Sequence, residues 1–233
     1  MRDLFSGLAG CLDFDPGARE VYESRVASRD RVLDVGGRNQ HSKSRRILAR
    51  LNRNPGNEVV SSDIFDDYGP DIVDDICHTT IAPESFDGVY CSAILEHVEE
   101  YWLAIDNIHR ILKPGGEAFF YVPFFWPLHD RTDFHRFTAT EVRRMLAPFP
   151  EVRILLPGRD SGFGFVLWQI LSFGGIDRFA ALHSGLARLT NGVLKMALSL
   201  AHAIRKPETP LREFVFYYTY LYINHGFCAY VRK

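Results

Sequence analysis

The sequence has little of what marks secreted, membrane-spanning or metal-rich proteins. It contains four cysteines among 233 residues, and no two of them form a Cys-x-x-Cys pair. This scatter argues against a zinc site and a disulfide framework, so we expect reduced thiols, a cytoplasmic protein and no metal. No run reaches the roughly 18 to 20 apolar residues of a membrane-spanning helix. The first residues also lack the apolar stretch of a signal peptide.

An excess of charge of either sign is also missing. The formal net charge is -2, which gives no general attraction to nucleic acid. No basic stretch interleaves with aromatic residues either, so we expect no nucleic-acid partner. Hydrophobic residues make up 46% and charged residues 24%, as in a globular protein that buries a full core. The length suits one domain with an addition.

The sequence does contain an alternation of short apolar strands and amphipathic helices. The predicted strands cover residues 31–35, 58–63, 70–76, 86–92, 117–125, 151–156 and 226–232. The predicted helices cover residues 42–52, 101–112 and 138–146. Thr138 and Glu141 form a capping-box pattern at the start of the last helix. Strands separated by helices predict an α/β fold, a doubly wound and mostly parallel sheet in which ligands bind beyond the carboxyl ends of the strands.

Acidic residues and glycines follow the first three predicted strands. Asp34 lies in the first strand, just before Gly36 and Gly37, and glycines let a backbone approach a ligand closely. Asp63 ends the second strand, where an acid can bind both hydroxyls of a ribose. Asp75 lies at the end of the third strand, where a carboxylate can accept from an adenine amine. Each position is explained equally well by a turn or a helix cap, so both alternatives stay open here.

The order and spacing of five segments resemble those of the class I S-adenosylmethionine-dependent methyltransferases. The segments read RVLDVGG, SSD, DIVDDI, SFDGVYCSAILEHV and IHRILKPGGEAFFYVP. The resemblance covers about residues 29–158 and the last strand, which is similar to the antiparallel seventh strand of that Rossmann-like fold. It implies a seven-stranded sheet, S-adenosylmethionine as cofactor and a small-molecule acceptor. Residues 122–146 further resemble a bacterial subgroup associated with sugar and cell-envelope biosynthesis.

Carried onto this sequence, the resemblance implies a cofactor site along the strand ends. The implied residues are Asp34, Gly36 and Gly37 at the methionine end, Asp63 at the ribose, Asp75 and Ile76 at the adenine, and Ser92 and Ala93 at the floor. Leu95, Glu96 and His97 shape the rim. Arg38 and Gln40 depart from the glycines of the family. Either Asn39 or Gln40 contacts the cofactor carboxylate, or Arg38 pairs with it, or binding is lost.

The loop at residues 127–137 carries the candidate catalytic groups. A hydroxyl acceptor must lose its proton, which calls for a base that titrates near neutral pH. His129 is the first candidate and His135 the second, with Asp133 as a catalytic partner that orients the base. The alternative is that Asp133 pairs with Arg136 and only pins the loop.

Residues 163–224 break the alternation and predict a helical insertion between the two parts of the methyltransferase domain, residues 1–162 and 225–233. Apolar residues recur there at steps of three and four, which predicts an amphipathic helix. They are Leu182, Leu186, Leu189, Val193, Met196 and Leu200. We favour a core stripe for them. The alternatives are a lid over the acceptor, a homodimer surface or a patch on the inner face of a membrane.

The resemblance thus predicts an enzyme that transfers a methyl group from S-adenosylmethionine to a hydroxyl or carboxylate of a small molecule. A saccharide or an envelope precursor is the predicted acceptor. The alternative comes from another class of protein, a catalytically idle methyltransferase-like module that binds a partner through its aromatic helices. Arg38 and Gln40 are its main support.

Overall fold

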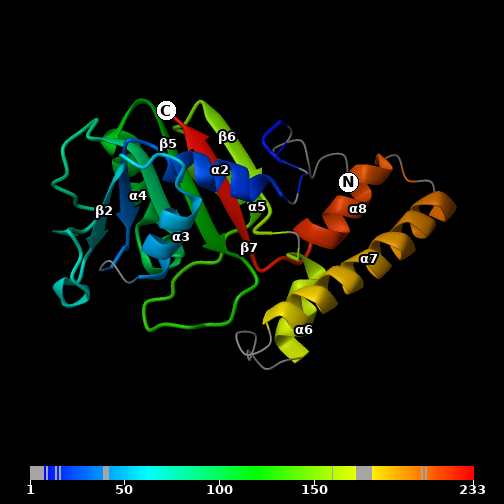
Figure 1. The fold of residues 1–233 in the computed structure, drawn as a ribbon. Helices are drawn as coiled ribbons and strands as arrows, with labels where there is room; N and C mark the ends of the chain where they lie inside the picture. The colour runs from blue at the N-terminus through cyan, green and yellow to red at the C-terminus, as the bar shows by residue number, and fades with distance from the viewer. Residues whose placement is uncertain are drawn as a thin grey trace.

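The protein is built around one seven-stranded sheet (Figure 1). The structure is a computed structural model and describes residues 8, 10–13, 15, 17–38, 42–158, 160–171, 180–205, 207 and 209–233. The strands are β1 (Arg31–Val35), β2 (Glu58–Asp63), β3 (Ile72–Val73), β4 (Phe86–Ser92), β5 (Leu112–Pro123), β6 (Glu151–Leu155) and β7 (Gly226–Arg232). Their order is β3-β2-β1-β4-β5-β7-β6. β7 runs antiparallel to both of its neighbours, which confirms the predicted doubly wound methyltransferase-type sheet.

Four helices cover the two faces of this sheet. They are α2 (Ala18–Ala27), α3 (Lys43–Leu51), α4 (Tyr101–Ile111) and α5 (Ala139–Met145). Side chains alternate across each strand, so Val32 belongs to the core cluster that includes residues of α2 and α3, while Leu33 belongs to the cluster that includes residues of α4 and α5. β1 is therefore buried on both faces. Its sequence is apolar from Val32 to Val35 except for Asp34.

Local signals in the sequence explain where several elements begin. The Thr138 side chain accepts from the Glu141 amide at 3.1 Å, so the predicted cap of α5 is confirmed. Ser42 caps α3 in the same way, through the Arg45 amide at 3.2 Å. β5 starts earlier than predicted, at Leu112. The Gly115 amide donates to the Lys233 carbonyl at 2.9 Å, which brings the glycine turn into the sheet.

The segment before β7 forms an arm of helices that extends away from the sheet (Figure 1). Its elements are α6 (Phe163–Leu171), α7 (Ala180–Arg205), α8 (Leu211–Phe216) and the π-helical turn η4 (Tyr217–Leu221). α6 and α7 approach closely at Gly164, which has no side chain. A Cβ at this position would lie 2.3 Å from the Ala187 carbonyl oxygen, so a larger residue would not fit there. Asn191 joins the two helices by accepting from the Gly164 amide at 2.8 Å.

The apolar stripe predicted on α7 faces away from the protein, so our favoured interpretation of a core stripe is wrong. Leu189 is 64% exposed and Met196 is 70% exposed. The inward face carries His183, Ala187 and Asn191 instead. The helix turns this face inward because Asn191 satisfies polar backbone groups of the preceding segment. Among the described residues, no helix is long and apolar enough to cross a membrane.

Candidate active site

A cavity of about 670 Å³ opens at the carboxyl ends of β1, β4 and β5. Sites for drug-sized ligands commonly measure about 300 to 1,000 Å³. The parallel register sets Val35 beside Cys91, so the turns that follow β1 and β4 lie next to each other. The wall combines these strand ends with the loop after β5 and one residue of the helical arm, Phe165.

Asp34 is a buried acid in the wall of this cavity. It is 1% exposed, and burial raises the pKa of its carboxyl group to about 6. The Ser44 hydroxyl donates to its Oδ2 at 2.7 Å. Gly36 beside it has a φ of 70°, and a Cβ there would lie 2.0 Å from the Ile94 side chain. A ligand with a positive group would therefore restore the charged carboxylate that burial disfavours.

Three more of the predicted cofactor residues line the same cavity: Arg38, Ser92 and Ala93. Ala93 has a φ of 56°, an unusual backbone conformation for a residue with a side chain. The Arg38 guanidinium lies over the Tyr68 ring, 3.8 Å from its centroid. Asn39 and Gln40, the alternatives to Arg38, lie outside the described residues.

The acids at the ends of β2 and β3 are not in the cavity wall. Asp63 accepts from the Phe65 amide at 2.9 Å. Asp75 accepts from the Cys77 amide at 2.9 Å and lies 3.0 Å from the His78 ring, and this histidine lowers the pKa of its carboxyl group. Both make the contacts of turn residues, so their assignment to ribose and adenine stays a prediction.

Gly37 and Ile76 also lie outside the cavity wall. A Cβ on Gly37 would meet the Asp34 carboxylate at 2.5 Å, so this glycine makes room for the buried acid. Ile76 is buried in the core beneath the third strand end. Their predicted contacts with the cofactor also stay predictions.

Of the three predicted catalytic residues, His129 alone lines the cavity. Its Nδ1 lies 3.1 Å from Asp133 Oδ2. Asp133 has a fully buried side chain and is held by both ends of the Arg136 guanidinium, which lowers the pKa of the carboxyl group. Asp133 therefore both pins the loop and orients His129. His135 turns elsewhere, with its Nε2 2.9 Å from the Glu99 carbonyl and its ring against Tyr101.

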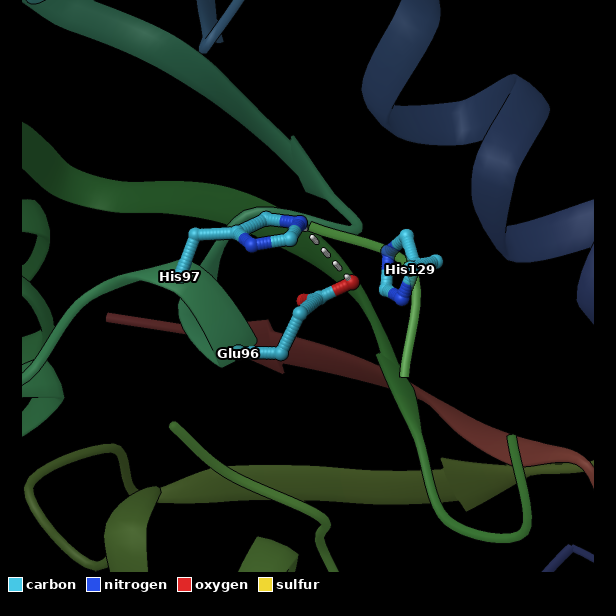
Figure 2. Close-up of side chains that lie close together, drawn as sticks. All are labelled: Glu96, His97 and His129. Atoms are coloured by element: carbon cyan, nitrogen blue, oxygen red, sulfur yellow. Dashed lines mark ion pairs between the residues drawn. The ribbon is translucent and has the colours of Figure 1, made fainter. Parts of the chain in front are cut away.

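The structure adds two residues that the sequence placed only at the rim, Glu96 and His97 of the short helix η2 (Leu95–His97). Glu96 lines the cavity, is 1% exposed, and has one carboxylate oxygen, Oε2, without a hydrogen-bond partner. Burial raises the pKa of its carboxyl group to about 7. In Figure 2 this carboxylate points into the space between the His97 and His129 rings. An acid a few residues after the end of β4 was the available signal, but nothing in the sequence places His129 beside it.

Aromatic side chains form the other part of the wall. Tyr121, Trp126, Phe165 and His225 all line it. The Phe165 ring lies 4.1 Å from the His225 ring, centroid to centroid. Burial lowers the pKa of His225 to about 3, so its imidazole is neutral at ordinary pH. The helical arm therefore contributes directly to the site through Phe165.

A parallel sheet closed by one antiparallel strand, with a ligand cavity at the ends of β1 and β4, defines the Rossmann-like methyltransferase fold. Residues 42–120 match the family model described as "Methyltransferase domain". Over these residues the chain is similar to methyltransferase domains, which agrees with the predicted resemblance at this level.

Individual relatives agree with this domain. The ubiquinone biosynthesis O-methyltransferase of Pseudomonas syringae pv. tomato (strain ATCC BAA-871 / DC3000) is 50% identical over 38 residues, which are 16% of each chain. A SAM-dependent methyltransferase from Archaeoglobus fulgidus superposes with a TM-score of 0.53 at 14% identity, over 93% of this chain and 95% of that one.

A third relative is much longer than this chain. It is phosphoethanolamine N-methyltransferase 2 of Haemonchus contortus in complex with S-adenosyl-L-methionine, with a TM-score of 0.52 at 15% identity. The match covers 92% of this chain and 51% of the other protein, so the chain spans about half of that protein's length. At identities this low, the two superpositions show a shared fold and nothing beyond it.

Proposed function

We propose that the protein is an S-adenosylmethionine-dependent methyltransferase that acts on a hydroxyl group of a small molecule. The observation that carries this proposal is that one cavity joins two kinds of site. Its wall contains both the buried carboxylate of Asp34 and the ring of His129, which is paired with Asp133. The methyltransferase domain match and the fold support the same reaction. A catalytically idle module is not favoured, because it would not need a buried acid and a histidine facing one cavity.

The residues in the wall fit this cofactor. S-adenosylmethionine carries an ammonium and a sulfonium, and Asp34 would supply the negative partner that a cationic ligand prefers. Arg38 would pair with its carboxylate. The left-handed backbone at Gly36 and Ala93 turns the chain beside the cavity at the ends of β1 and β4. Asp63 would bind the ribose hydroxyls after giving up its hydrogen bond to the Phe65 amide. Asp75 and Ile76 would contact the adenine.

The loop after β5 would supply the acid–base chemistry. Bound S-adenosylmethionine supplies a methyl carbon, which bonds to the acceptor oxygen while the carbon–sulfur bond breaks and sulfur keeps the electron pair. His129 would accept the hydroxyl proton on Nε2, because Nδ1 faces the Asp133 carboxylate. Asp133 would then stabilise the imidazolium. Holding the acceptor in line is worth roughly 7 to 11 kcal/mol in well-oriented reactions.

The wall also favours one class of acceptor. Tyr121, Trp126 and Phe165 offer flat apolar surfaces to a ring-shaped molecule. Glu96 places an acidic group in this wall, which favours a hydroxyl over the carboxylate that the sequence left open. The curated relative is an O-methyltransferase, which supports oxygen as the nucleophile. We propose a saccharide or a cell-envelope precursor as the acceptor, supported by the resemblance of residues 122–146.

Ligand binding and turnover together test this proposal. S-adenosylhomocysteine should raise the melting temperature of the purified protein, since a ligand that binds only the folded state stabilises it. His129→Ala should keep this shift and lose methyl transfer to a hydroxyl acceptor by about 10²- to 10⁴-fold. No shift at millimolar ligand would overturn the proposal and favour the idle module. Unchanged turnover in His129→Ala would remove this histidine from the reaction.

We also propose that the exposed face of α7 contacts an anionic membrane surface. Its apolar residues form a stripe that a free surface rarely carries. The helix has no Asp or Glu, while Arg188 and Arg205 are exposed on it. Apolar and basic groups together suit the boundary of an anionic bilayer better than a second copy of the same basic helix.

A further inference from the structure

A carboxylate and two imidazoles converge beside the cavity from two separate elements, η2 and the loop after β5. Glu96, His97 and His129 each offer one ligand atom, and these atoms all lie within 4.8 Å of one another. His97 Nε2 is 3.9 Å from Glu96 Oε1 (Figure 2). We propose that these three residues bind a divalent transition-metal ion.

Both histidines are oriented as metal ligands are. His97 Nδ1 lies 2.6 Å from the Thr132 carbonyl. His129 Nδ1 is hydrogen-bonded to the Pro127 carbonyl at 3.3 Å and lies 3.1 Å from the Asp133 carboxylate. These oxygens can only accept, so each ring carries its proton on Nδ1 and keeps the lone pair of Nε2 free. Metal-bound histidines nearly always donate their other nitrogen to a carbonyl or a carboxylate in this way.

Glu96 lacks the partner that a buried carboxylate requires. Its Oε2 is buried without a hydrogen bond, although the residue is 1% exposed. The neighbouring cation, Arg136, is occupied, because it binds Asp133 and donates to the Trp126 carbonyl at 3.1 Å and the Pro127 carbonyl at 3.0 Å. An unpaired buried charge is costly, and a bound cation would supply the missing partner.

The donor set indicates the kind of ion. Calcium and magnesium prefer oxygen ligands alone, whereas imidazoles with a carboxylate suit zinc, manganese, iron(II) or cobalt(II). Bonds of about 2.0 to 2.2 Å place ligand atoms roughly 3.3 Å apart around a tetrahedral ion. The separation between Glu96 and His97 needs only a small contraction to reach this. Our expectation of no metal rested on cysteine spacing, which carries no information about this set.

Three protein ligands leave a coordination position open, and Glu96 and His129 direct it toward the cavity. If the proposed function holds, the ion would bind the acceptor oxygen and lower the pKa of its hydroxyl. The ion would then replace His129 as the activating group, and the proton would leave to water.

Cobalt(II) titration of the full chain, stripped of metal with a chelator, tests the site directly. Visible absorption and calorimetry should show one equivalent bound, displaced by zinc. Glu96→Gln and His97→Ala should each weaken cobalt binding at least tenfold. His78→Ala serves as the matched control, since His78 lies 3.0 Å from a carboxylate, Asp75, but outside the cluster. This control should bind cobalt as the wild type does.

Affinity for S-adenosylhomocysteine, measured on the same samples, separates the two proposals. A folded wild-type protein that binds S-adenosylhomocysteine but takes up no cobalt would overturn the metal site and leave the proposed function standing. Equal cobalt binding in the wild type and both cluster variants would also overturn it. Melting curves of Glu96→Gln, a variant of nearly equal size, show whether a loss of cobalt reflects the ligand or the fold.

Discussion

The cavity and the outer face of α7 invert the usual distribution of side chains in opposite ways. The cavity buries carboxyl groups, with Asp34 and Glu96 each 1% exposed. The α7 face exposes apolar groups, with Leu189 and Met196 mostly in solvent. Buried acids and contiguous exposed apolar residues are both uncommon in folded proteins. Each region therefore indicates a partner that the isolated chain does not supply.

The two regions differ in what the missing partner must be. A buried carboxyl group costs much more free energy in its charged form than in its neutral form, so the cost at the cavity depends on pH and is relieved by a cation. An exposed apolar face depends little on pH and is relieved by any surface that excludes water. This difference separates the experiments that test the two regions.

The largest expected effect is on the pH dependence of stability. Burial raises the folded-state pKa of Asp34 from 3.8 to about 6, so the folded protein binds more protons than the unfolded chain in this window. Its free energy of unfolding should therefore fall as the pH rises from about 4 to about 6. Asp34→Asn should remove up to about 3 kcal/mol of this fall, at about 1.4 kcal/mol per pKa unit. Urea unfolding of the ligand-free protein at pH 4.5 and pH 7.5 measures it.

Glu96 should act in the same direction, since burial raises its pKa from 4.5 to about 7. Metal-free conditions are needed, because a cation would lower that pKa. A constant stability difference between the wild type and Asp34→Asn at both pH values would show that the Asp34 carboxyl group does not carry the cost of the cavity.

The next effect is on cofactor affinity. Asp34→Asn should weaken S-adenosylhomocysteine binding by about 1.5 to 3 kcal/mol, the range for hydrogen bonds to charged groups, or roughly 10- to 100-fold. Asn keeps the size of Asp and can still accept from Ser44, so the fold should persist. Calorimetry measures the change, with the exposed Asp106→Asn on α4 as a control that should bind normally. If Asp34→Asn bound S-adenosylhomocysteine with full affinity, the buried carboxylate of Asp34 would not contribute to ligand binding.

A smaller loss is expected at the neighbouring strand end. Asp63→Ala should weaken binding by about 1 kcal/mol, because a ribose contact would first have to replace the hydrogen bond to the Phe65 amide. Asp133→Ala, measured in the same calorimeter, should change affinity less, since Asp133 lies in the loop after β5 and faces His129. If Asp63→Ala and Asp133→Ala lose affinity equally, the ribose assignment is wrong.

Much of the sheet could be predicted because its signals are local. β1, β2, β4 and β7 begin and end at the predicted residues, since alternation, glycines and caps act within a few residues. The position of Asp34 at the cavity followed from the general rule that ligands bind at the carboxyl ends of parallel strands.

The rest depended on contacts between distant segments. The direction in which α7 turns its stripe depends on Asn191 meeting α6, and no pattern within the helix contains this. The meeting of Glu96 and His129 depends on the path of a loop that Asp133 and Arg136 hold in place. At Asp63 the sequence allowed both a turn and a ligand role, and the turn contact is the one the structure contains.

The smallest effect on stability is expected at α7. A small effect there would distinguish its exposed apolar face most clearly from the buried acids of the cavity. Leu189→Ser combined with Met196→Ser should change the free energy of unfolding by no more than about 0.5 kcal/mol, since both side chains already face solvent. The same double variant should stop co-sedimenting with vesicles of anionic lipid, whereas the wild type should co-sediment and be released by salt. Its affinity for S-adenosylhomocysteine should not change, which serves as the internal control.

Sedimentation equilibrium without lipid decides whether a second copy covers the stripe instead. A wild-type dimer that the double variant converts to a monomer would contradict the membrane proposal, as would recovery of the wild type in the supernatant of the vesicle assay. A large loss of stability in the double variant would mean that the stripe is covered within the chain itself. The exposed leucines would then belong to the core, and the contrast with the buried acids of the cavity would disappear.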